Sequence, residues 1–164
     1  MIASMIRASM GPDTDRAHPA LRAFSLVFPY LLALFIAYVF LHYLPFKFAP
    51  GSALFQTIED WAGVDWVEPY FRNFTGGVEL LASILLFVPG LQVAGAALAL
   101  GTMSGAICLH LFTPLGVDPY NDGGTLFKEA CTVWVFALTI LAIRRREVLP
   151  LVRRILVDPR FTRS

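Results

Sequence analysis

The stretch from Gly76 to Leu111 limits what this chain can fold into, because it is almost entirely apolar. Pro89 and Gly90 interrupt it near the middle, and a Pro-Gly pair is typical of a tight turn. We therefore predict two apolar helices that lie side by side as antiparallel neighbours. One acid, Glu79, lies inside the first helix, and one histidine, His110, lies near the end of the second.

Composition extends this prediction to the whole chain. Of the 164 residues, 57% are hydrophobic and 15% are charged, whereas soluble domains carry about 25% charged residues. The length corresponds to one domain. Both cysteines, Cys108 and Cys131, lie in apolar runs, which does not indicate the disulfide framework of a secreted protein. The sequence predicts an integral membrane protein, for which we expect no nucleic-acid partner.

Four segments are apolar enough for a membrane-crossing helix, which needs about 20 apolar residues. They cover about residues 21–46, 71–88, 91–112 and 124–143. The predicted fold is an all-α integral membrane four-helix bundle occupying residues 21–143. Residues 1–20 are predicted to be a mobile cytoplasmic tail without a removable signal peptide. Residues 144–164 are predicted to be a basic cytoplasmic tail.

The loop between the first two spans has a different character. From Leu54 to Ala62 apolar residues recur at helical spacing, and the opposite face is polar. Trp66 and Tyr70 follow, and such side chains concentrate at the membrane–water interface. We predict short interfacial helices in this first extracytoplasmic loop, lying on the membrane surface.

Basic residues predict the orientation, because cytoplasmic loops carry an excess of them. Ten of the 13 lie on the side of the two termini: Arg7, Arg16, Arg22, Arg144, Arg145, Arg146, Arg153, Arg154, Arg160 and Arg163. This distribution predicts that both termini are cytoplasmic. The segment 148–157 is basic and amphipathic, so we expect it to lie on the anionic inner leaflet.

The third span carries small residues four positions apart, at Ala97, Gly101 and Gly105. Small residues at this spacing let helix backbones approach closely in lipid. We expect this face to make a tight contact within the bundle. A seam between two copies of the chain is the alternative.

Polar residues are predicted to converge on the outer half of the bundle. Glu79 lies seven residues after Arg72, or about 10 Å deeper at a rise of 1.5 Å per residue. An acid at the centre of a spanning helix costs about 2.5–3.5 kcal/mol, so it should face the bundle. Similar depth estimates give a predicted set of site residues: His42, Lys47, Glu79, His110, Asp122, Lys128 and Glu129.

Lys128 is a special member of this set, because a cation in the first turn of a helix opposes the helix dipole. We therefore expect it to have an acidic partner. Glu79, Asp122 and Glu129 are the alternatives.

Three interpretations of the polar set remain open. It is a buried network that fixes the helix arrangement, or a pocket for a proton, a quinone or a small polar ligand. In the third and least favoured interpretation, His42 and His110 bind a metal or haem. No HExxH or CxxC spacing is present, so we predict no metal site. The chain has no nucleophile–base pair or cofactor motif, so no reaction is assigned to it.

Several motifs together resemble the DoxX-like family between Ala23 and Ile143. They are PFKF with Lys47, GGVELL with Glu79, LLFVPG at the turn, and MSGAICLHL at the end of the third span. The resemblance implies a small four-helix bacterial inner-membrane protein. Some relatives are membrane subunits of sulfur-compound:quinone oxidoreductases, or partners of redox-stress enzymes. The family offers no agreed set of catalytic residues to transfer.

The favoured hypothesis is an accessory or anchoring subunit of a redox complex with a polar pocket on the extracytoplasmic side. The cofactor is not assigned, and quinone is the candidate. The expected partners are the lipid bilayer and other membrane or redox proteins, and a second copy of the chain is a further candidate. One alternative is a proton-linked transporter or permease using Glu79, although four spans show no inverted repeat. The other is a purely structural membrane protein.

Overall fold

The computed structural model describes residues 19–147, with side chains from residue 24 onward, and this part of the chain is helical without strands. The elements are α2 (Pro19–Phe48), α3 (Ala53–Ala62), the short π-helical turn η2 (Val67–Phe71), α4 (Arg72–Leu85), α5 (Gln92–Phe112) and α6 (Thr125–Ile143). The predicted all-α class is confirmed. The predicted N-terminal tail and the amphipathic segment 148–157 lie outside the described residues.

Three helices are long and apolar enough to cross a membrane, over Phe24–Phe48, Gln92–Phe112 and Thr125–Ile143. They correspond to the first, third and fourth predicted spans. α2 has 30 residues, or about 45 Å at the rise of an α-helix, which exceeds the roughly 30 Å of a hydrocarbon core. The prediction of a membrane protein with spanning helices is therefore supported by helix length as well as by composition.

The second predicted span is shorter than expected. α4 has 14 residues, or about 21 Å, which is less than the thickness of the hydrocarbon core. The chain leaves the helix after Leu85 and turns at Pro89 and Gly90, where Gly90 has a φ of 84°. The predicted tight turn is present, and a membrane crossing by α4, the second predicted span, stays a prediction.

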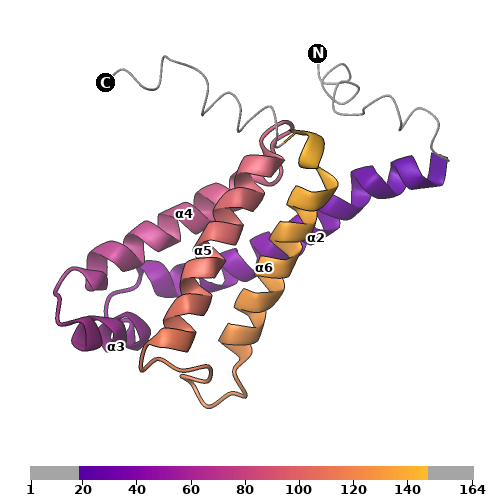
Figure 1. Cartoon of the computed structure of the whole chain (residues 1–164). Helices are drawn as coiled ribbons and strands as arrows, with labels where there is room; N and C mark the ends of the chain where they lie inside the picture. Colours follow the sequence, from indigo (N-terminus) through magenta and orange to yellow (C-terminus); the bar gives the residue numbers. More distant parts are fainter. Residues whose placement is uncertain (1–18, 148–164) are drawn as a thin grey trace.

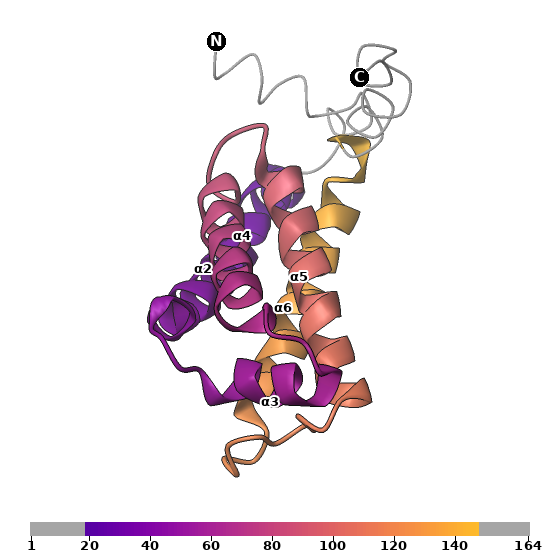
Figure 2. The same ribbon diagram turned by 90° about the vertical axis from the view of Figure 1, so that its left-hand side faces the viewer.

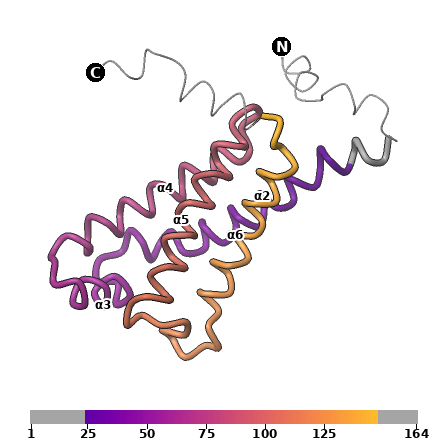
Figure 3. The backbone as a smooth tube through the Cα atoms, in the orientation of Figure 1, coloured from indigo at the N-terminus to yellow at the C-terminus, as the bar shows by residue number. Residues whose placement is uncertain are grey.

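Helices α2, α4, α5 and α6 form a closed ring in which α2 contacts α4, α4 contacts α5, α5 contacts α6, and α6 contacts α2 (Figures 1 and 2). The backbone tube shows that α2 runs obliquely to α5 and α6 (Figure 3). The α4–α5 turn and the end of α6 lie at one end of the molecule. At the other end lie α3 and the α5–α6 loop, with α3 crosswise beneath the ring (Figure 2).

Two clusters of buried apolar side chains hold this arrangement. The larger one joins all four ring helices and includes Ile36, Phe40, Leu86, Ala99 and Val133. The smaller cluster fastens α3 to the end of the ring through Phe55, Ile58, Val67 and Leu115. α3 therefore buries one face against the ring, as its helical spacing predicts.

Large apolar side chains also cover the outside of the ring. They include Phe24, Val27, Leu31, Leu34, Leu41, Ile84, Val135 and Leu138. Soluble monomers rarely expose contiguous apolar surface of this extent. The outer surface is compatible with contact with lipid.

Candidate functional site

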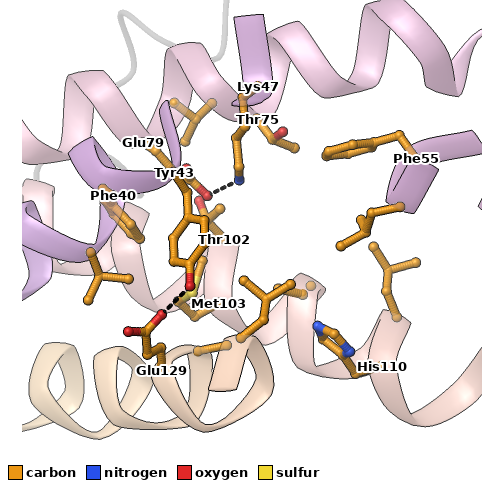
Figure 4. Close-up of a pocket in the computed structure, with 18 of the residues that line it drawn as sticks. Phe40, Tyr43, Lys47, Phe55, Thr75, Glu79, Thr102, Met103, His110 and Glu129 are labelled. Carbon is orange, nitrogen blue, oxygen red and sulfur yellow. Dashed lines mark hydrogen bonds and ion pairs between the residues drawn. The ribbon is translucent and has the colours of Figure 1, made fainter. Parts of the chain in front are cut away.

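A cavity of about 590 Å³ lies inside the ring, at the end that α3 covers (Figure 4). Binding sites for small molecules usually have volumes of about 300–1,000 Å³. Its wall is mostly apolar, with residues such as Val39, Phe40, Phe55, Phe71, Val78, Leu98, Met103, Leu109 and Leu126. The cavity is partly open to the outside, and its volume gives room for a small ligand.

The first polar pair in the wall is an ion pair between Lys47 in the last turn of α2 and Glu79 in α4 (Figure 4). The Glu79 side chain is 2% exposed, and that of Lys47 is 19% exposed. The two helices meet closely at Gly76, where an added Cβ would lie 3.1 Å from the Cβ of Lys47. The glycine one turn before Glu79 thus allows the lysine to reach the acid.

The second polar pair joins α2 to α6. The Tyr43 hydroxyl donates a hydrogen bond of 2.7 Å to Glu129. Tyr43 lies four residues before Lys47, so the two side chains share one face of α2. That face places both polar pairs on the cavity wall.

His110, near the end of α5, is the third polar feature of the wall and is 4% exposed. Its Nδ1 lies 2.6 Å from the carbonyl oxygen of Gly116. Because a carbonyl only accepts, Nδ1 carries the hydrogen and donates it. The ring also packs against Phe127 with 5.5 Å between centroids. Figure 4 shows the ring pointing into the cavity.

The structure brings four of the seven predicted site residues to this cavity: Lys47, Glu79, His110 and Glu129. The other three lie outside it. His42 is exposed and stacks on Tyr38 with 5.9 Å between ring centroids. Asp122 accepts a hydrogen bond of 3.0 Å from the backbone N–H of Thr125, at the start of α6.

The expectation of an acidic partner for Lys128 is wrong. Its side chain is exposed, and no ion pair forms there within residues 19–147. Glu79 pairs with Lys47, and Glu129 accepts from Tyr43. An exposed ammonium remains solvated, so the unfavourable helix position needs no compensation by a carboxylate.

The loop between α5 and α6 is ordered by Asp118. Its carboxylate accepts hydrogen bonds from the backbone N–H groups of Asp122 and Gly123, at 3.0 and 3.2 Å. Desolvation raises the pKa of Asp118, but the backbone N–H groups outweigh it and hold this pKa below its ordinary value. In the same loop, burial and the nearby Asp122 raise the pKa of Tyr120, so this phenol keeps its proton.

The expectation of tight packing at Ala97, Gly101 and Gly105 is also wrong. All three line the cavity, and a Cβ added at Gly101 or Gly105 would meet no atom within 4 Å. The close approach of α4 and α5 occurs instead at Gly95, where an added Cβ would lie 2.7 Å from the Leu86 nitrogen. The small residues therefore provide the space of the cavity.

Arg72 is a buried charged residue beside the site that the sequence analysis did not include. It is 2% exposed, and its Nε lies 2.7 Å from both carboxylate oxygens of Glu68. Its Nη1 donates to the carbonyl oxygen of Lys47. Arg72 thus ties the start of α4 to the end of α2, next to the first polar pair. The spacing of four residues from Glu68 was the available signal.

Hydroxyl groups in the wall were missed as well. Tyr43, Thr75 and Thr102 line the cavity, and Thr75 and Thr102 donate to backbone carbonyls of their own helices. Within residues 19–147, no cluster of three or more His, Cys, Asp or Glu side chains could hold a metal ion. Cys108 and Cys131 are free thiols.

No protein-family model matches the chain, and neither a curated protein nor a solved structure matches it. The DoxX-like resemblance stays a prediction.

Proposed function

We propose that the protein is a DoxX-like, multi-pass inner-membrane protein that binds an apolar molecule with a polar head group. In this proposal it is the accessory or anchoring subunit of a quinone-linked redox complex. The observation that carries the proposal is the mostly apolar cavity of about 590 Å³, with two polar pairs and His110 in its wall. Apolar walls with a few placed polar groups are typical of small-molecule sites.

The shape of a quinone suits such a cavity. Its ring and isoprenoid tail are apolar, and its oxygens lie at the edge of the ring, where they can meet isolated polar side chains. Three of the four surrounding helices, α2, α5 and α6, are long and apolar enough to cross a membrane, so a lipid-soluble ligand could reach the cavity without entering water. In this proposal the chain binds and positions the quinone, and a partner protein contains the redox centre.

The accessory role predicts stable association with a larger partner that carries a redox cofactor. Purification of the natively expressed protein in mild detergent should yield a complex with a visible absorption spectrum from that partner. A chain that always migrates as a solitary monomer would contradict the accessory role and leave the ligand site intact.

The proposed topology has four spans, with the short α4 completed by apolar residues up to Val88. A bilayer accommodates a short span by thinning locally, at a cost of fractions of a kcal/mol per Å. Both termini are then cytoplasmic, and α3 and the cavity face the extracytoplasmic side. Single cysteines at Gly63 and Glu147, in a variant with both native cysteines replaced by serine, can test this.

In intact spheroplasts, an impermeant thiol reagent should label the Gly63→Cys variant. The Glu147→Cys variant should be labelled only after the membrane is permeabilised. The reverse pattern would contradict the proposed orientation, and labelling of both sites in intact spheroplasts would contradict the four-span topology.

Filling the cavity is expected to remove the bound molecule. Gly101→Leu introduces a side chain into space that no atom occupies within 4 Å of its Cβ, so the helices need not move. We expect at least a tenfold loss of co-purified apolar molecule per protein, measured by solvent extraction and mass spectrometry. Leucine also has a higher helix propensity than glycine, so α5 should remain stable.

Gly77→Leu is the matched control. Gly77 is an exposed helical glycine of α4 with open space around its Cβ, and it does not line the cavity. This variant should retain the wild-type amount of bound molecule. Equal amounts in the Gly101→Leu and Gly77→Leu variants would contradict the assignment of the cavity as the binding site.

A further inference from the structure

We infer that the cavity selects a ligand whose head group is a hydroxyl, in preference to the same molecule with a carbonyl or an ether. A phenol or a quinol fits this description, and a quinone does not. The inference rests on the proposed function and names the chemical class of its ligand. The preference depends on which hydrogen-bond donors and acceptors in the cavity wall have no protein partner.

The hydroxyl groups inside the ring already donate their hydrogens to acceptors of the protein. Tyr43 donates to Glu129 at 2.7 Å, Thr75 donates to the carbonyl of Arg72 at 2.8 Å, and Thr102 donates to the carbonyl of Leu98 at 2.9 Å. A hydroxyl has one hydrogen and two lone pairs. These three side chains can therefore only accept a hydrogen bond from a ligand.

His110 adds an acceptor. Its Nδ1 hydrogen is donated to Gly116, so in the neutral imidazole Nε2 carries a lone pair. Within residues 19–147 no hydrogen bond to Nε2 forms, although the side chain is 4% exposed. The ring points into the cavity (Figure 4). Nε2 is not among the buried side-chain atoms without a partner, so it is accessible from the cavity that His110 lines, and a donor on the ligand can bind it.

Lys47 is the exception, because its ammonium has three N–H groups and one of them binds Glu79. A ligand group beside Lys47 can accept a hydrogen bond, and a ligand group beside His110 can donate one. A hydroxyl can do either. A carbonyl or an ether only accepts, and an ammonium only donates.

The other hydroxyls of the wall, on Ser52 and Tyr120, lie outside the ring helices. Tyr120 is exposed, so it can exchange hydrogen bonds with water and does not decide the selectivity. The interior of the cavity thus contains several free acceptors and one free donor group. For a quinone-type ligand this arrangement favours the reduced, dihydroxy form.

The test compares 4-nonylphenol with its methyl ether, which have the same ring and chain and differ only in the hydrogen-bond donor. Their affinities for the full chain in nanodiscs are measured by calorimetric titration and corrected with empty nanodiscs. One hydrogen bond to a neutral acceptor corresponds to about five- to tenfold in affinity. We expect the phenol to bind more tightly by this factor, and His110→Leu to bring the ratio close to one.

The decisive measurement is the ratio of the two affinities for the wild-type protein. His110 also holds the α5–α6 loop, so its replacement could disturb the fold. Equal affinity for the two compounds, or tighter binding of the ether, would overturn the selectivity and leave the ligand cavity standing. Binding of both compounds that is unchanged in the Gly101→Leu variant would place them outside the cavity and overturn the selectivity. Failure of both compounds to bind the wild-type protein would overturn the proposed ligand site itself.

Discussion

Lys47→Met is expected to destabilise the protein by about 3–5 kcal/mol, because breaking a buried ion pair leaves an uncompensated buried charge. The charge left behind is Glu79, whose side chain is 2% exposed. Glu79→Gln should cost less, because Lys47 is 19% exposed and can turn its ammonium toward water. Unfolding by titration with a denaturing detergent measures both free energies.

The double variant Lys47→Met/Glu79→Gln separates the ion pair from simple packing. Without a charge at either position, most of the loss in Lys47→Met should be recovered. Lys128→Met is the matched control, since this lysine is exposed and makes no ion pair within the described part of the chain; it should leave the stability unchanged. A double variant as unstable as the sum of the two single variants would contradict the coupling.

Arg72→Met should produce the second large effect, also about 3–5 kcal/mol, because it leaves Glu68 without its buried partner. It also removes the donor to the Lys47 carbonyl at the end of α2. We expect η2 and α3 to detach locally, so that limited proteolysis cuts the segment between α2 and α4. The free energy of unfolding and the cleavage rate are the two measurements.

Arg72→Lys is a sharper comparison than the methionine variant. A lysine keeps the charge but lacks the planar fork that reaches Glu68 and the Lys47 carbonyl together. It should therefore recover only part of the stability. Arg145→Met, at an exposed arginine beyond α6, controls for loss of charge alone. Full stability in the Arg72→Met variant would show that this contact does not hold the end of α2.

The long helices could be predicted from the sequence because their apolar runs exceed the length of a membrane span. The amphipathic spacing of α3 and the turn at Pro89-Gly90 were equally visible. The length of α4 could not be predicted from the sequence. Its apolar run continues to Val88, whereas the helix ends at Leu85. The sequence therefore overestimates a helix that ends shortly before a proline.

Residue counts along the helices predict that Lys47, Glu79, His110 and Glu129 lie at a similar level of the bundle, and all four line the cavity. The counts do not predict which side of each helix faces the cavity. Which side of a helix faces inward is decided by packing against its neighbours. His42 and Tyr43 are adjacent in sequence, about 100° apart around the helix. One is exposed and the other lines the cavity.

The small residues of α5 show a second limit of the sequence. Spacing of four between Ala97, Gly101 and Gly105 is the same whether another helix or a cavity lies opposite. Gly95, six residues before Gly101 and closer to the α4–α5 turn, makes the close backbone contact. Only the position of α4 distinguishes these two uses of small residues, and that position depends on the whole ring.

An experimental structure in lipid nanodiscs, by electron microscopy with a rigid antibody fragment, tests the central claim most directly. We predict elongated density inside the ring, between Gly101 of α5 and the Lys47–Glu79 pair, with its polar end near His110. The same density should be absent from the Gly101→Leu variant. A collapsed ring, in which side chains of neighbouring helices pack directly on Gly101 and Gly105, would contradict the claim that this protein holds a ligand within the membrane.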